Sequence, residues 1–205
     1  MNPLEFSKKE KPAHFTVLFS HGNAVDIGQH FPWLQMAWFL VLFACKFNVN
    51  VFCYDYSGYG LSSGQTLEKN LYADAEAAIY QLKTRYNVPL DQIVLYGQSI
   101  GTAPTVHLAT KYKVAGVVLH SPLMSGLRVI CPKTKVNLCF DPFANINKVA
   151  KIQSPTLIIH GEQDEMIGIH HGEELHAKLQ FPLNPAWIKN CGHNDIEISP
   201  DYPLR

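Results

Sequence analysis

The stretch Leu95-Tyr96-Gly97-Gln98-Ser99-Ile100-Gly101 is the most informative part of this chain. It carries the pattern G-x-S-x-G between an apolar run and a helix-compatible stretch. A strand, a sharp turn and a helix in this order are typical of a nucleophile elbow, in which a strained turn holds a serine hydroxyl above the edge of a sheet. The glycines two residues to either side leave room for that turn. We therefore predict that Ser99 is a nucleophile, with Gly97 and Gly101 as its structural support.

Strand-like and helix-like segments alternate along the rest of the chain. The strand-like runs are rich in Val, Ile, Leu and Phe, and most show no polar alternation, which is typical of strands buried on both faces of a parallel sheet. The expected strands are Thr16–Ser20, Val49–Tyr54, Ile93–Tyr96, Ala115–Leu119, Thr156–His160 and Ala186–Ile188. The expected helices are His30–Phe47, Leu67–Tyr86, Gly101–Tyr112 and Gly168–Lys178. Right-handed crossovers between such segments build a doubly wound α/β sheet with helices on both faces.

The composition is that of one neutral globular domain. The chain has 205 residues, 47% of them hydrophobic, which suits a single domain over residues 1–205 with a sizeable core. Residues 1–12 are polar, and we expect them to form a poorly ordered N-terminal segment. Lys and Arg total 17, as do Asp and Glu. Because phosphate binding needs concentrated positive charge, we expect no nucleic-acid partner.

The cysteines and the apolar segments indicate a cytoplasmic protein. The five cysteines form no C-x-x-C pair, which is typical of reduced thiols in the cytosol. The apolar run at residues 36–45 is about half as long as a membrane span, so we expect a buried or partly interfacial helix there and favour the buried one. We expect a monomer that is either free in the cytoplasm or in peripheral contact with the cytoplasmic face of a membrane.

Reactive side chains follow the expected strands at their carboxyl ends, where the functional residues of a parallel sheet collect. A serine hydroxyl needs a base to accept its proton, and the base needs an acid that orients it. On an elbow-bearing fold these groups follow the chain order Ser, Asp or Glu, then His. Ser99, Asp164 and His193 fit that order as nucleophile, acid and base. The alternatives for the acid are Glu162, Glu165 and Asp141.

The loop after the first strand supplies the second half of an expected oxyanion hole. Two backbone N–H groups are needed, one from the residue after the nucleophile and one from this loop. We assign them to Ile100 and Asn23, with His21 and Gly22 supporting the loop. No metal or cofactor is needed. The histidines of the last helix lack a third ligand in view, so we expect a surface helix there; they are His170, His171 and His176.

Five stretches together resemble one known family. They are Leu18–Asp26, Tyr54–Gly60, Leu95–Thr102, His120–Leu123 and Gly192–Glu197. They resemble the alpha/beta-hydrolase-domain-containing protein 17 family, in which Ser57 is discriminating because many related hydrolases carry Arg there. The resemblance implies an α/β-hydrolase fold with Ser99 as nucleophile, Asp164 as acid and His193 as base. It also implies removal of palmitate from cysteine thioesters of membrane-attached proteins.

The chain departs from that family near both ends. The family carries a cysteine-rich, palmitoylated N-terminal segment, whereas Met1–Pro12 has no cysteine. The fold usually has further strands before the first one here and a helix after the catalytic histidine, but Pro200 and Pro203 oppose a helix there. We therefore expect a sheet shortened at both ends. Residues 121–152 leave room for a small lid or none.

The expected function is that of a serine hydrolase acting on acyl thioesters. The most direct reading is depalmitoylation of S-palmitoylated cysteines by a palmitoyl-protein thioesterase, with an S-acylated protein or peptide as substrate. A carboxylesterase, lipase or serine peptidase would use the same machinery, because acyl specificity lies in the shape of the pocket. An inactive, truncated binding module is the remaining alternative.

Overall fold

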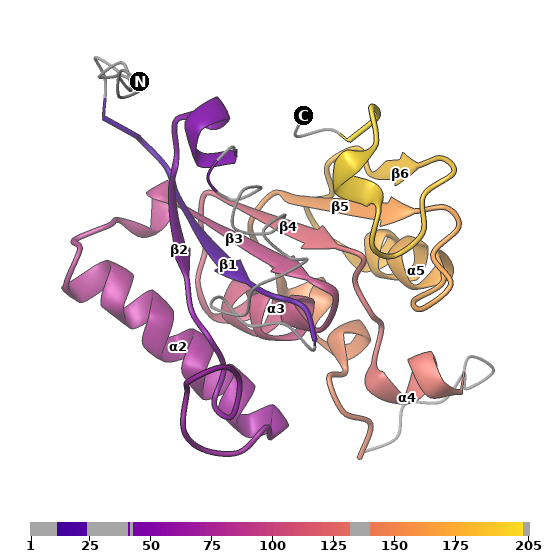
Figure 1. The fold of residues 1–205 in the computed structure, drawn as a ribbon, viewed down its shortest axis with the longest axis horizontal. Coiled ribbons are helices and arrows are strands. Elements are labelled where there is room, and N and C mark those ends of the chain that lie inside the picture. The colour runs from indigo at the N-terminus through magenta and orange to yellow at the C-terminus, as the bar shows by residue number, and fades with distance from the viewer. Residues whose placement is uncertain (1–11, 24–40, 42, 132–139, 203–205) are drawn as a thin grey trace, which may run out of the picture.

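A six-stranded parallel sheet forms the centre of the protein (Figure 1). The computed structural model describes residues 12–23, 41, 43–131 and 140–202. The strands are β1 (Thr16–Ser20), β2 (Asn50–Cys53), β3 (Ile93–Gln98), β4 (Gly116–His120), β5 (Thr156–Gly161) and β6 (Ala186–Ile188). Their order across the sheet is β2-β1-β3-β4-β5-β6.

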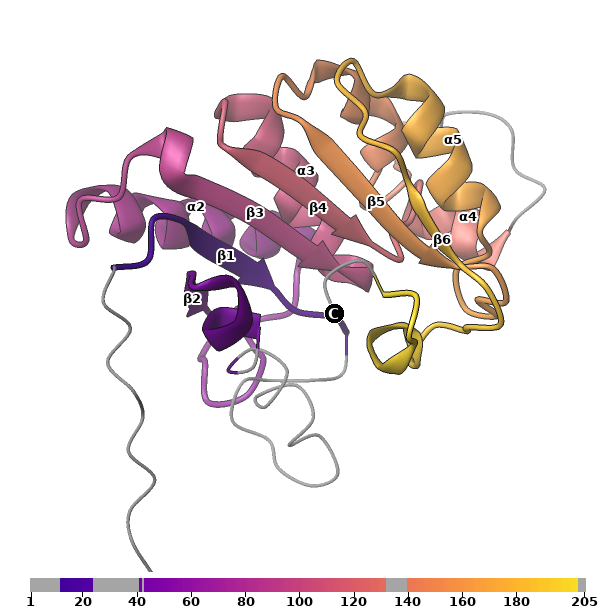
Figure 2. The same ribbon diagram turned by 90° about the horizontal axis from the view of Figure 1, so that it is seen from above.

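Helical segments cover both faces of this sheet. The α-helices are α2 (Glu68–Thr84), α3 (Thr102–Lys111), α4 (Gly126–Ile130) and α5 (His170–Lys178). Figure 2 shows α2, α3 and α5 together on one face, while the helical residues 43–47 and the C-terminal arm, residues 194–202, lie on the other. Among the described residues, no helix combines the length and the apolar character needed to cross a membrane.

The strands bury apolar side chains on both faces, as the lack of polar alternation predicts. In β1, Leu18 joins the large core beneath α2 and α3. Its neighbours Val17 and Phe19 point the other way and pack with Tyr96 of β3 and with Phe43. A parallel sheet needs such a cover on each face, because its backbone and apolar side chains are otherwise exposed to water.

Most helices and strands begin and end close to the residues predicted from the sequence. β1 and β6 have the predicted limits, and the buried residues of α2 recur at three- and four-residue spacing. The helix expected over residues 30–47 lies mostly outside the described residues, of which Val41 and 43–47 are helical. The disorder expected for residues 1–12 also falls outside the described part, except for Pro12. The number of domains stays a prediction.

The helix α5 has an exposed face, as expected for a surface helix, but its residue His171 faces inward. This residue is 1% exposed, and its Nδ1 accepts a hydrogen bond from the backbone N–H of Met124, at 3.0 Å. The contact fixes the segment after β4 against α5. The pKa of His171 is lowered to about 4, chiefly because the ring is buried and also because other histidines lie nearby. The ring is therefore neutral at neutral pH and serves as an acceptor.

We expect this buried histidine to make the protein sensitive to acid. An unfolded chain binds a proton at His171 below about pH 6.5, whereas the folded chain binds it only near pH 4, so stability falls between these values. Urea unfolding should show a loss of about 2 kcal/mol from this group between pH 7 and pH 4.5. His171→Asn, which keeps an acceptor but does not titrate, should lose less. An equal loss in both proteins would contradict the assignment.

Candidate active site

The candidate site lies where the strand order reverses direction. β1 has β2 on one side and β3 on the other, and ligands of open α/β sheets bind at the carboxyl ends of the strands at such a switch point. The residues after β1 reach the elbow after β3. A Cβ placed on Gly22 would lie 3.7 Å from the Cβ of Ser99. The topology therefore brings together the two loops that the sequence analysis assigned to one site.

The elbow has the strained geometry that its glycines predict. Ser99 has a φ of 53°, in the left-handed region that non-glycine residues rarely adopt. A Cβ on Gly97 would collide with the carbonyl of Gly101 and with the hydroxyl of Thr105. A Cβ on Gly101 would collide with the carbonyl of Ser20 and lie 2.6 Å from that of His21. Gly97 is therefore needed for the turn to fold against the start of α3, and Gly101 is needed for it to pack against the end of β1.

Ser99, His193 and Asp164 form one hydrogen-bonded chain. The Nε2 of His193 lies 3.1 Å from the Oγ of Ser99, and its Nδ1 lies 2.7 Å from the Oδ2 of Asp164. Ser99 directly follows β3, Asp164 lies in the loop after β5, and His193 lies in the loop after β6. His193 and Asp164 are both 7% exposed. The geometry can transfer a proton from the serine to the imidazole, with the carboxylate holding the ring.

Asp164 is held as an ionised carboxylate. Its Oδ1 accepts hydrogen bonds from the backbone N–H groups of Met166, at 2.9 Å, and Ile167, at 2.7 Å. Burial raises the pKa of Asp164, but the hydrogen bonds from His160, His193 and Ile167 outweigh it and hold the pKa well below its usual range. The group therefore acts on His193 through its negative charge and does not take up a proton.

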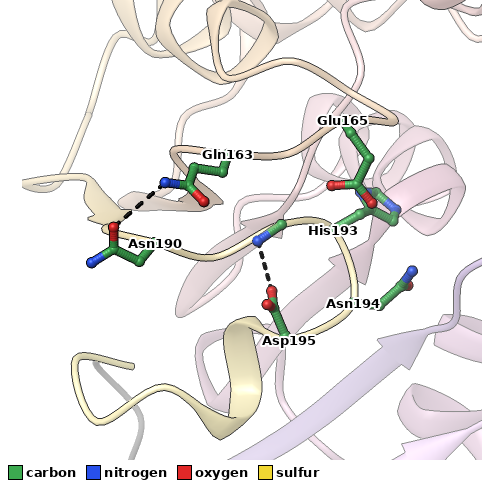
Figure 3. Close-up of a pocket in the computed structure, with 7 residues that line it drawn as sticks. Gln163, Glu165, Asn190, His193, Asn194 and Asp195 are labelled. Carbon is green, nitrogen blue, oxygen red and sulfur yellow. Dashed lines mark hydrogen bonds between the residues drawn. The ribbon is translucent and has the colours of Figure 1, made fainter.

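The loop that carries His193 is fixed on both sides. Upstream, the N–H of Gly192 donates to the Oδ1 of Asp195 at 2.7 Å (Figure 3). Downstream, the C-terminal arm returns to β3, where Gln98 donates to Glu197 at 2.7 Å and the hydroxyls of Tyr96 and Tyr202 are 2.7 Å apart. The base and the nucleophile strand are thus tied by contacts other than their own hydrogen bond.

The alternatives for the acid do not reach the base. Asp141 is buried in an ion pair with Arg128, at 3.1 Å. Glu162 and Glu165 are both exposed. Glu165 lines an open, polar pocket of about 350 Å³ beside His193 (Figure 3). Asp164 is the carboxylate that contacts the Nδ1 of His193.

The two residues assigned to the oxyanion hole both lie beside the elbow. Ile100 sits in the tight turn Ser99–Gly101, directly before α3, where backbone N–H groups have no partner within the helix. Asn23 follows Gly22, and its side-chain Oδ1 accepts a hydrogen bond from the hydroxyl of Tyr59 at 2.7 Å. That the backbone N–H groups of Ile100 and Asn23 bind the oxyanion stays a prediction.

Aromatic residues after β2 support this loop in a way that the sequence did not specify. The hydroxyl of Tyr56 donates to the carbonyl of His21 at 2.8 Å, and the two rings lie 4.2 Å apart. His21 Nδ1 also lies 2.9 Å from the carbonyl of Gly22. Tyr56 and Tyr59 therefore fix the chain on either side of Gly22.

The sequence analysis missed His160, which lies beside Asp164. The Nε2 of His160 is 3.3 Å from the Oδ2 of Asp164, and both side chains are fully buried. A signal was present, because His160-Gly161 ends β5 as His21-Gly22 follows β1. In the part of the chain that the structure describes, no group of three or more His, Cys, Asp and Glu side chains is arranged to hold a metal ion.

The sheet, the elbow and the loop arrangement define a protein with the α/β-hydrolase fold. An alpha-beta serine hydrolase homologue from Coxiella burnetii superimposes with a TM-score of 0.72 at 16% identity, over 96% of this chain and 86% of that one. This likeness confirms the predicted fold. A family model described as "Serine aminopeptidase, S33" matches residues 12–144, so the chain belongs to that hydrolase family.

Two relatives with closely related names match this chain over most of its length. The chain is 53% identical over 190 residues, 93% of its length, to the human "Alpha/beta hydrolase domain-containing protein 17B". It is equally similar, over the same share of its length, to the protein named 17C of Xenopus tropicalis. The resemblance that the motifs indicated is thereby confirmed. The chain spans 64% and 59% of the lengths of these two relatives.

Proposed function

We propose that this protein is a serine hydrolase with Ser99, His193 and Asp164 as its catalytic triad. The observation that carries the proposal is the unbroken hydrogen-bond chain from the serine to the ionised carboxylate, with separations of 3.1 Å and 2.7 Å. The strained elbow at Ser99 adds support, because such strain persists where the surrounding structure imposes it and is frequent at active sites.

The proposed reaction proceeds in two acyl-transfer steps. The Oγ of Ser99 attacks the acyl carbonyl carbon while the Nε2 of His193 takes the serine proton. The negative oxygen of the tetrahedral intermediate is stabilised by the N–H groups of Asn23 and Ile100. The intermediate collapses, and the leaving group departs with the proton from His193. Water, deprotonated by His193, then attacks the carbonyl carbon of the acyl-Ser99. The bond to the Oγ breaks, His193 returns the proton to the Oγ of Ser99, and the acid is released.

We propose acyl thioesters on protein cysteines, palmitoyl thioesters above all, as the substrate class. The motif resemblance supports this choice. So does the approach to the nucleophile, since Ser99 is only half-buried and the described residues between β4 and β5 include just one short α-helix, α4. Within the described residues, this short cover leaves the approach to Ser99 open to a bulky acylated peptide.

A matched pair of substrates tests this choice. One peptide carries palmitate on a cysteine, and the other carries it on a serine at the same position. We expect the thioester to be cleaved with a kcat/KM at least about tenfold higher, which corresponds to about 1.4 kcal/mol in the barrier. Equal or faster cleavage of the oxygen ester would favour a carboxylesterase or lipase. Cleavage of neither by a folded wild-type protein would favour a binding module.

A further inference from the structure

We propose that His160 is a positioning residue that sets how strongly Asp164 holds the base His193. The inference rests on the proposed triad and extends it to a fourth side chain. His160 is the second-last residue of β5, four residues before Asp164, and its ring is fully buried. Its role would be exerted through the carboxylate.

The position of the ring determines where its hydrogen lies. The Nε2 of His160 is 2.6 Å from the carbonyl oxygen of Ile167 and 3.3 Å from the Oδ2 of Asp164. A carbonyl and a carboxylate oxygen only accept hydrogen bonds, so this nitrogen must carry the hydrogen. His160 therefore donates toward the same carboxylate oxygen that binds the Nδ1 of His193.

Four donors surround the Asp164 carboxylate as a result. Two backbone N–H groups, of Met166 and Ile167, bind Oδ1. Two imidazoles, those of His193 and His160, face Oδ2. An acceptor shared between two donors binds each of them less strongly than it would bind one alone. His160 thus weakens the hydrogen bond between the Oδ2 of Asp164 and the Nδ1 of His193.

The surroundings of His160 hold this orientation. A Cβ on Gly172 of α5 would lie 2.7 Å from the Nδ1 of His160, so the helix approaches the ring at a residue without a side chain. Among the described residues, that Nδ1 has no hydrogen-bond partner. Four ionisable side chains lie close enough to interact electrostatically with His160 or with its partner Asp164. They are Asp164 itself, His193, His171 and His120.

A pair of similar side chains separates positioning from space filling. His160→Gln places an amide N–H near the position of Nε2, whereas His160→Met has a similar length but no donor. In His160→Met, Asp164 binds His193 more strongly and favours its protonated form. We expect kcat/KM at neutral pH to fall about tenfold and the acid limb of its pH profile to move to higher pH. His160→Gln should keep the wild-type profile.

A second readout does not depend on catalysis. The proton between His193 Nδ1 and Asp164 gives a downfield NMR signal, which should move further downfield in His160→Met and stay in place in His160→Gln. An unchanged signal and an unchanged acid limb in His160→Met would overturn the inference. If His160→Met does not fold, His160→Asn, whose amide is too short to reach Asp164, takes its place. A wild-type protein without hydrolase activity would contradict the proposed function, while the NMR signal would still test His160.

Discussion

Ser99→Ala should abolish covalent labelling by a fluorophosphonate probe and lower kcat on an acyl substrate by roughly 10⁵-fold or more. The substitution removes one atom, the Oγ that lies 3.1 Å from the Nε2 of His193. It keeps the Cβ and leaves the glycines of the elbow untouched, so the folded structure should persist. Gel fluorescence with the probe and steady-state hydrolysis measure the two effects.

The control for this experiment is Ser62→Ala, which removes another serine hydroxyl and leaves the chain from Ser99 to Asp164 intact. The hydroxyl of Ser62 lies 3.5 Å from the carbonyl oxygen of Asp55, which is long for a hydrogen bond, so its removal should change the free energy of unfolding little. Both variants should unfold at nearly the wild-type temperature, and only Ser99→Ala should lose labelling. Labelling that survives in Ser99→Ala would mean that a different residue is the nucleophile.

Gly101→Ala should lower the free energy of unfolding by about 3 kcal/mol, because the added methyl group has no space. The backbone of Gly101 has φ −60° and ψ −15°, a conformation that alanine adopts readily. The steric collision with the carbonyl groups of Ser20 and His21 therefore decides the result. These are backbone atoms at the end of β1, and they can move only if the strand moves.

Gly116→Ala is the matched control for that substitution. Gly116 is a half-buried glycine of strand β4, but a Cβ there would meet only the carbonyl of Pro155, at 3.8 Å, an ordinary contact. Urea unfolding of both variants should show a lower midpoint for Gly101→Ala and a near wild-type midpoint for Gly116→Ala. Equal midpoints would show that the elbow can retreat from β1 at little cost.

The sequence predicts those parts of the site that are encoded by neighbouring residues. The elbow is one such part, because strand, turn glycines and helix all lie within about twenty residues around Ser99. The order of Ser99, Asp164 and His193 follows from the sheet, since the carboxyl ends of parallel strands lie along one edge. Once the fold class is predicted correctly, it follows that these three side chains lie at the same edge of the sheet.

Contacts between distant segments are the part that the sequence leaves open. Tyr59 and Asn23 are 36 positions apart, and their hydrogen bond depends on how the loops after β1 and β2 bend. His171 appears in a polar helix, and periodicity alone does not say that its ring faces Met124. His160 resembles an ordinary strand-ending residue until β5 and the Asp164 loop are placed in space.

The C-terminal arm makes the nucleophile and the base a single mechanical unit. Gln98, the neighbour of Ser99, is bonded to Glu197, and Tyr96 of the same strand meets Tyr202. His193 lies on the chain just before this arm, so we expect the histidine and the serine to move together. The 3.1 Å between Nε2 and Oγ should then vary less than the position of either residue alone. A short peptide arm would in this way keep two distant segments at the separation that proton transfer needs.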